Sequence, residues 1–214
     1  MTALTQADAL RLPLADDSVD LVVTSPPYFA LRSYRDDGEH YDGQIGSEAT
    51  PQEFLEALWA ATVEMVRVVK PSGSIFVNLG DKYAQRPGQQ QPRDQGGDLK
   101  GSKAGVAFLN RGQEEATFGE TRPKSLIGLP WRYAIGCIDD LGLILRSEIV
   151  WSKPNGLPES VTDRVRRSHE QWFHFTLEPH YFSAIDEIRE AHLTGGGVTV
   201  EERRAADTEA YETP

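Results

Sequence analysis

The chain has 214 residues, which is enough for one domain with a proper hydrophobic core. It contains no run of about 18 apolar residues that could span a membrane, and its single cysteine, Cys137, excludes an internal disulfide and a cysteine-built zinc site. The first residues lack the basic and apolar regions of a signal peptide, so we expect a cytoplasmic protein.

The formal net charge of −11 argues at first sight against a nucleic-acid partner, but the charge is unevenly distributed. Residues 1–81 hold 13 acidic and five basic side chains, whereas residues 82–134 hold nine basic and five acidic ones. The basic part is polar and rich in Gly and Gln. Its composition suits a loop that meets phosphates and, equally, a solvated disordered loop.

The first predicted element is a strand in the segment SVDLVVTS, residues 18–25. Its apolar residues are continuous rather than alternating, which is typical of a parallel strand covered on both faces. Pro26 and Pro27 follow directly. Proline cannot donate to a sheet ladder and has a fixed φ, so the pair ends the strand with a stiff corner, at the end where open α/β sheets bind ligands. The apolar run consists of Val19, Leu21, Val22 and Val23.

A helix is predicted from Thr50 to Lys70. Thr50 is its N-cap, Pro51 occupies the first helical position, and Glu53 completes a capping box. The apolar face expected to pack on the core comprises Phe54, Leu55, Leu58, Trp59, Thr62, Val63, Val66 and Val69.

A turn at Pro71–Gly73 should follow this helix, and then a buried strand that ends at Asp81. A strand, a helix and a second strand joined by short links predict a right-handed βαβ unit, and therefore an α/β fold. Residues 82–122 lose all periodicity and are predicted to be an inserted polar loop, either disordered or functional.

The remaining predicted elements are a helix from Leu129 to Asp140 and two strands, LILRSEIVWSK (143–153) and EQWFHFTL (170–177). Residues 193–214 form a polar, acidic tail. Cys137 falls within the helix and is predicted to be a buried core residue.

At this point the residues resemble a known family. TSPPY, residues 24–28, resembles the catalytic motif of the DNA methyltransferases that modify an exocyclic amine, in phages and restriction–modification systems. Residues 43–84 and 124–182 resemble the family's following blocks, in the family's order. The resemblance implies a Rossmann-like class I methyltransferase fold, with residues 1–192 as the N4-cytosine or N6-adenine methylase domain.

The chemistry of that reaction explains the corner. The lone pair of an exocyclic amine is delocalised into the base, and hydrogen bonds accepted from its two protons would free the lone pair to attack a sulfonium methyl group. The resemblance assigns the side chain of Ser25 and the carbonyl of Pro26 as these acceptors, Pro27 as a rigid spacer, and Tyr28 as the face on which the flipped base stacks.

Several further assignments follow from the resemblance, each with an alternative. Asp8 and Thr24 would contact the cofactor, although Asp8 could instead belong to a surface turn. Asp81 would shape the site or cap a turn. Trp151 and Lys153 would line the target-base pocket, although Trp151 could be a core residue. The cluster Arg164, Arg166 and Arg167 would grip DNA phosphates or form a solvated group of charges.

The implied cofactor is S-adenosylmethionine, and the implied partner is double-stranded DNA with a flipped base, in a bacterial or phage-infected cell. No metal ion is expected. The Gly-rich turn that holds the methyl donor in this family is not found in the sequence, so we expect an incomplete fold that is truncated or needs a second polypeptide. The alternative is a catalytically inactive relic that binds DNA or a partner.

Overall fold

The computed structural model describes residues 3–31, 35–36, 39–40, 43–84, 121–155 and 161–188. The chain divides into two compact units, Met1–Tyr181 and Phe182–Pro214. The described part of the second unit contains one short 3-10 helix, η1 (Ile185–Ile188). The predicted boundary between residues 192 and 193 lies outside the described residues.

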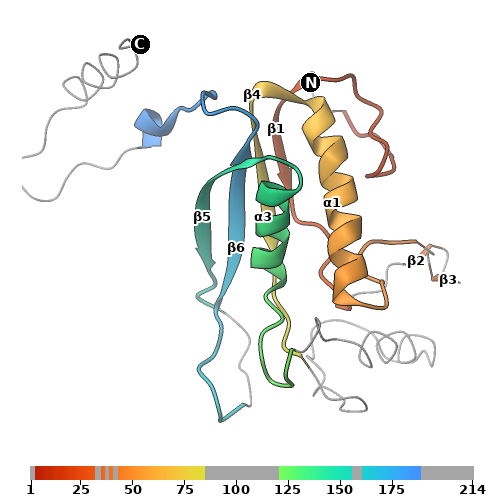
Figure 1. Cartoon of the computed structure of the whole chain (residues 1–214), viewed down its shortest axis with the longest axis vertical. Helices are drawn as coiled ribbons and strands as arrows, with labels where there is room; N and C mark the ends of the chain where they lie inside the picture. The colour runs from red at the N-terminus through yellow and green to blue at the C-terminus, as the bar shows by residue number, and fades with distance from the viewer. Residues whose placement is uncertain are drawn as a thin grey trace, which may run out of the picture. The chain divides into compact units, whose positions relative to one another are not determined.

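The first unit is built on a four-stranded mixed sheet (Figure 1). Strand β1 (Val19–Thr24) pairs in parallel with β4 (Val69–Leu79), which pairs antiparallel with β6 (His169–Thr176). The opposite edge is β5 (Ile144–Ser152), antiparallel to β6. A separate two-stranded pairing joins β2 (Arg35–Asp36) to β3 (Glu39–His40). All four strands of this sheet lie where the sequence predicted strands, although β4 begins earlier than expected, and the parallel β1–β4 pair confirms the expected strand–helix–strand unit.

Helix α1 (Pro51–Val68) begins as predicted. The side chain of Thr50 accepts a hydrogen bond from the backbone N–H of Glu53, and the Glu53 carboxylate accepts one from the N–H of Thr50. Two details of the predicted face are wrong. Val63 is half exposed, and Val69 is the first residue of β4 rather than part of the helix.

The turn predicted at Pro71–Gly73 is absorbed into β4. Pairing with β1 jumps at this point, from Val19 opposite Val69 to Leu21 opposite Ser74, so the intervening residues form an irregularity in the strand rather than a break. Close backbone contact explains the glycine: a Cβ on Gly73 would lie 2.8 Å from the carbonyl oxygen of Asp20.

The expectation that β1 is covered on both faces is wrong. Leu21 is 53% exposed and Val23 is 58% exposed. The reason lies in the arrangement of the helices: α1 and α3 (Leu129–Asp139) both pack on the sheet face that carries Ile75 and Phe175. Residues alternate between faces along a strand, so Leu21 and Val23 lie on the other face.

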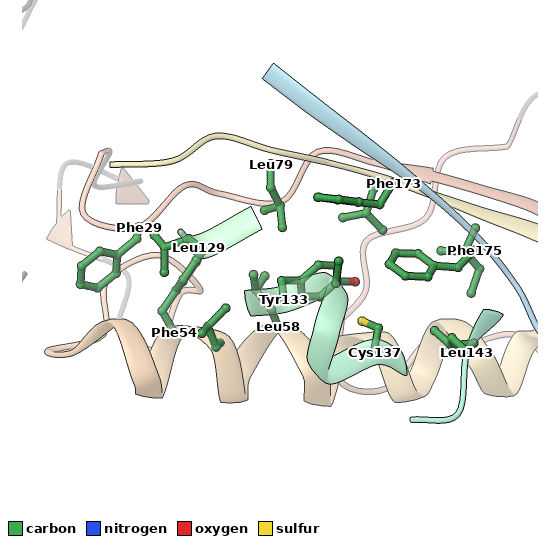
Figure 2. Packing of buried hydrophobic residues seen from close by; sticks show 14 of the residues in the cluster. Phe29, Phe54, Leu58, Leu79, Leu129, Tyr133, Cys137, Leu143, Phe173 and Phe175 are labelled. Atoms are coloured by element: carbon green, nitrogen blue, oxygen red, sulfur yellow. The ribbon is translucent and has the colours of Figure 1, made fainter. Parts of the chain in front are cut away.

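The core between the helices and the sheet is aromatic at its centre (Figure 2). Tyr133 of α3 packs edge-on against Phe175, and its hydroxyl is 2.8 Å from that of Thr62 on α1. Cys137 is fully buried in this cluster, and burial raises the pKa of its thiol to about 12. The prediction that Cys137 is a core residue is confirmed.

Beyond β4, the chain closes a short ladder at the base of residues 85–120. The N–H of Ala84 donates to the carbonyl of Ser125 at 2.8 Å, and the N–H of Lys124 donates to the carbonyl of Ala84 at 2.8 Å. Tyr83 and Leu126 form an antiparallel bridge beside them. The two ends of the predicted polar loop are therefore joined by backbone hydrogen bonds.

Candidate active site at the ends of strands β1 and β4

The corner that follows β1 is anchored from its downstream side. Ser25 is exposed, and Pro26, Pro27 and Tyr28 are half-buried. The next residue, Phe29, is buried and lies 5.5 Å from Phe54 of α1, measured between ring centroids. A buried aromatic residue directly after the two prolines limits how far the corner can move.

Asn78 organises the polar side chains of the corner. Its side-chain oxygen, Oδ1, accepts hydrogen bonds from the hydroxyl of Ser25 at 3.2 Å and from the hydroxyl of Tyr28 at 2.7 Å. Its amide nitrogen donates to the carbonyl of Gln171 at 3.1 Å, which fixes the orientation of the amide. Asn78 is 1% exposed, and sequence reasoning missed it. The available signal was a lone amide within an otherwise apolar strand.

The ring of Tyr28 is held at its hydroxyl and along its edge. The hydroxyl also lies 2.9 Å from Oε2 of Glu170, which sits at the start of β6. A Cβ on Gly80 would stand 2.6 Å from Cε2 of Tyr28, so the ring edge rests directly on the backbone of Gly80. Sequence reasoning missed both Glu170 and Gly80.

The predicted pocket residues divide into two groups. Lys153 joins the corner, because its ammonium pairs with Oε1 of Glu170 and lies 5.4 Å from the centre of the Trp151 ring. Trp151 is 49% exposed, so its interpretation as a core residue is wrong. The Trp151 ring lies at a tilt to Trp172, with 6.3 Å between centroids.

The three arginines have other surroundings. The Arg164 guanidinium lies 3.8 Å from the centre of the Tyr83 ring, at the base of residues 85–120. Arg167 donates to the side chain of Gln171 at 3.4 Å, and Arg166 is exposed. The ion pair between Lys124 and Asp163, at 2.5 Å, holds the same region together and lowers the pKa of Asp163. Two side-chain contacts therefore fasten the segment around Arg164 to the base of the loop.

Asp81 is a helix cap. Its carboxylate accepts hydrogen bonds from the N–H groups of Gly128 at 3.0 Å and Leu129 at 3.1 Å, at the first turn of α3. Gly128, the N-cap residue of α3, offers no side-chain cap of its own. A carboxylate at a helix N-terminus satisfies free N–H groups and complements the helix dipole. Of the two roles considered for Asp81, the contacts support capping.

The two predicted cofactor contacts also have defined positions. The carboxylate of Asp8 is exposed and accepts a hydrogen bond from the N–H of Leu10 at 2.9 Å, within a local turn closed by the N–H of Arg11. This is the surface turn considered as the alternative. Thr24 is half-buried at the end of β1, opposite Val77 of β4. A role for either residue in binding a cofactor stays a prediction.

Lys82, next to Asp81, is half-buried and lies over the ring of Phe29, the residue that anchors the corner. Its ammonium is 5.5 Å from the centre of the Phe29 ring, and burial lowers the pKa of Lys82 to about 8. Within the described part of the chain, no three His, Cys, Asp or Glu side chains are grouped to hold a metal ion.

Comparisons with known proteins agree on the class. A family described as DNA methylase, of the N6/N4 type, matches residues 19–209. The chain is 40% identical over 202 residues to the type II methyltransferase M.XycI of Xanthomonas campestris pv. cyanopsidis. That match covers 92% of this chain and 61% of the relative. It is 39% identical over 198 residues to M.Cfr9I of Citrobacter freundii, with coverages of 90% and 60%.

The fold has a counterpart among solved structures. The cytosine-N4-specific PvuII DNA methyltransferase superposes with a TM-score of 0.54 at 18% identity, over 89% of this chain and 57% of that one. The chain thus spans about 60% of the length of the curated relatives it matches. The α/β class I methyltransferase fold predicted from the sequence is confirmed, and the chain belongs to the N6/N4 family of DNA methylases.

Proposed function

We propose that this chain carries the catalytic corner of a site-specific DNA methyltransferase that moves a methyl group from S-adenosylmethionine to the exocyclic amine of cytosine (N4) or adenine (N6). The single observation that carries the proposal is the hydrogen bond from the Ser25 hydroxyl to Oδ1 of Asn78, at 3.2 Å. A hydroxyl has one proton and two lone pairs. When the proton is directed to Asn78, the lone pairs of Ser25 are left to accept from the substrate amine.

The other parts of the corner support the same assignment. The carbonyl of Pro26 would be the second acceptor for the amine. Because proline has no N–H, Pro26 presents no backbone donor beside that carbonyl. With its two protons hydrogen-bonded to these acceptors, the amine nitrogen gains lone-pair density for attack. A nitrogen–carbon bond would form as the bond between the methyl group and sulfur breaks, and one amine proton would then be released to water. S-adenosylmethionine would supply the electrophilic methyl group on its sulfonium sulfur. Tyr28 would stack on the base after it leaves the duplex.

DNA and the methyl donor complete the proposal. Double-stranded DNA with a flipped base would be the substrate. Asp8 and Thr24 would approach the donor, and a second polypeptide could supply the remaining donor-binding residues. A cytoplasmic location in a bacterial or phage-infected cell is part of the same proposal. No helix in the described ranges has the length and apolar character needed to cross a bilayer.

Replacing Ser25 tests the assignment. Ser25→Ala removes one acceptor and Tyr28→Ala removes the stacking face, so methyl transfer to DNA by the active assembly should be lost in both variants while circular dichroism is unchanged. Ser125→Ala is the matched control, because the Ser125 hydroxyl makes only a local hydrogen bond in an exposed turn. Near-normal turnover in both corner variants would contradict the proposal.

Salt dependence tests the DNA partner. Residues 82–134 carry the positive excess, and Lys100, Lys103 and Arg111 lie outside the described residues. If this segment meets phosphates, DNA affinity should fall steeply with salt, and replacing all three by Gln should weaken binding to every sequence alike. An unchanged affinity in the triple variant would identify the segment as a solvated loop.

The alternative function, an inactive relic of the fold, predicts a different result. Such a relic would bind DNA in these assays and transfer no methyl group.

A further inference from the structure

We infer that Glu170 and Lys153 are positioning residues that hold the ring of Tyr28 in place as a stacking face, an inference that rests on the function proposed above. Tyr28 belongs to the corner after β1, Lys153 follows β5, and Glu170 is the second residue of β6. The carboxylate of Glu170 therefore links the corner after β1 to the β6–β5 pair, which lies on the other side of β4 in the sheet.

Both oxygens of the Glu170 carboxylate are engaged. Oε2 faces the Tyr28 hydroxyl at 2.9 Å, and Oε1 pairs with the Lys153 ammonium. The side chain of Glu170 is 16% exposed, so its charge is largely removed from water and needs a cationic partner. A carboxylate with both oxygens committed holds its neighbours in place, and it is poorly placed to accept a proton from the substrate.

Three contacts fix the Tyr28 ring. The Tyr28 hydroxyl lies 2.7 Å from Oδ1 of Asn78 and 2.9 Å from Oε2 of Glu170, and its single proton is shared between these two acceptors. Gly80 meets the ring edge, since a Cβ at that position would lie 2.6 Å from Cε2 and 2.9 Å from Cδ2. A ring fixed at its tip and along one edge has little freedom to rotate about χ1 and χ2. Preorganisation of this kind removes the entropy cost of ordering the ring when a base stacks on it.

The roles of the two charged residues are unequal. Glu170 contacts Tyr28 directly, whereas Lys153 acts on Tyr28 through Glu170. The Lys153 ammonium also lies 5.4 Å from the centre of the half-exposed Trp151 ring, which favours its position by a cation–π contact. Loss of Lys153 should therefore leave the mostly buried carboxylate of Glu170 without its cationic partner. We expect that carboxylate to rotate towards solvent and to lose its contact with the Tyr28 hydroxyl.

The test follows the ring itself. The full chain, labelled with 3-fluorotyrosine, gives one 19F resonance set for each of its seven tyrosines, and Tyr28→Phe identifies that of Tyr28. Glu170→Ala should shift and narrow the Tyr28 resonance as the ring begins to flip freely. Glu170→Gln keeps one oxygen for the Tyr28 hydroxyl and should produce a smaller change, and Lys153→Met should resemble Glu170→Ala. Glu178→Gln, an exposed glutamate just beyond β6, is the matched control and should leave the resonance in place.

Nucleotide binding supplies the second readout. Titration with deoxycytidine and deoxyadenosine monophosphates, followed at the Tyr28 resonance, should show affinity falling by up to roughly tenfold in Glu170→Ala, the size expected when one side chain must be ordered on binding. Nucleotide affinity should be highest in the wild type, lower in Glu170→Gln and lowest in Glu170→Ala. Circular dichroism identifies any variant that fails to fold. If Glu170→Ala fails to fold, the comparison of wild type with Glu170→Gln tests the inference.

The outcomes separate the inference from the proposed function. An unmoved Tyr28 resonance in Glu170→Ala and Glu170→Gln would overturn the inference. Equal loss of affinity in these two variants would also overturn it, because that result points to a need for the negative charge rather than for the contact. A wild-type chain that binds neither nucleotide, with a Tyr28 resonance that still moves in Glu170→Ala, would support the positioning role and contradict the proposed stacking of a base.

Discussion

The ring of Tyr28 rests on the backbone of Gly80, with Cε2 of Tyr28 only 2.6 Å from the point where a Cβ on Gly80 would stand. Gly80 follows β4 and Tyr28 follows β1, so the contact joins the carboxyl ends of the two parallel strands. A methyl group at this position would have to push the aromatic ring away.

Gly80→Ala should therefore impair the corner through Tyr28. We expect a loss of roughly 1–3 kcal/mol in unfolding free energy, the usual cost of overpacking, and a strong reduction of methyl transfer. In a Tyr28→Ala background the clash is absent, so Gly80→Ala should then be nearly neutral for stability. A double-mutant cycle by urea denaturation measures the coupling. Equal costs in the two backgrounds would show that the contact does not constrain the ring.

Asp81→Ala should destabilise α3. The variant leaves the N–H groups of Gly128 and Leu129 without their carboxylate acceptor, and loss of such a cap typically costs about 1 kcal/mol. Asp139→Asn at the exposed C-terminal end of the same helix is the control. It removes an acidic group where the helix dipole disfavours one, so its effect should be neutral or slightly stabilising. Similar losses in both variants, measured by urea denaturation, would contradict the capping role.

Lys82 makes stability depend on pH in the alkaline range. Burial lowers the pKa of Lys82 from 10.5 to about 8 in the folded chain. The folded state disfavours the charged amine, so this penalty is fully present below pH 8 and disappears as pH rises towards the unfolded pKa of 10.5. Between these values the unfolded state binds more protons, and the contribution of Lys82 to stability should increase with pH.

The comparison of wild type with Lys82→Met isolates that contribution. Other groups titrate equally in both proteins, so the stability difference between them should shrink as pH rises from 8 towards 10.5. Lys82→Met should be the more stable protein at neutral pH because it keeps the apolar contact with Phe29 without a buried charge. A difference that does not change across this pH range, followed by urea denaturation, would show that the amine titrates normally.

The exposed strand β1 should promote self-association. Among the described residues β1 pairs with β4 alone, so its other edge presents unpaired backbone groups, and its face opposite the helices carries the half-exposed side chains of Leu21 and Val23. A charge on an edge strand opposes pairing between copies. Val23→Lys should therefore lower light scattering at high protein concentration. Ile135→Lys, at a 51% exposed apolar position on α3, tests whether any added charge has the same effect. Equal improvement in both variants would remove the edge as the cause.

Features that depend on neighbouring residues could be predicted from the sequence, whereas features that depend on distant parts of the chain could not. The capping box of α1 and the corner after β1 were predicted because neighbouring residues determine them. The coverage of β1 was predicted wrongly: a continuous apolar run indicates an apolar strand but does not reveal which faces the described helices cover. The turn at Pro71–Gly73 was also wrong, because an irregular strand and a turn use the same residue types.

The polar contacts of the candidate site could not be predicted from the sequence, because they join residues that are far apart in the chain. The hydroxyl of Tyr28 meets a carboxylate 142 residues later in the chain, and Asn78 lies 50 residues from Tyr28. No local pattern predicts contacts between residues so far apart. The family motif supplied Ser25 and Tyr28, whereas the side chains that orient them became visible only when the register of β4 and β6 was known.

The backbone hydrogen bonds that join Ala84 to Lys124 and Ser125 separate the geometry of the sheet from the sequence that stands between these residues. Because these bonds already fix the exit from β4 and the approach to α3, residues 85–120 can be lengthened, shortened or exchanged at a cost that grows only with the logarithm of their number. The corner and the helix cap would be untouched by such an exchange. A change in the length or composition of this insert therefore needs no second mutation to repair the sheet, the corner or the helix cap.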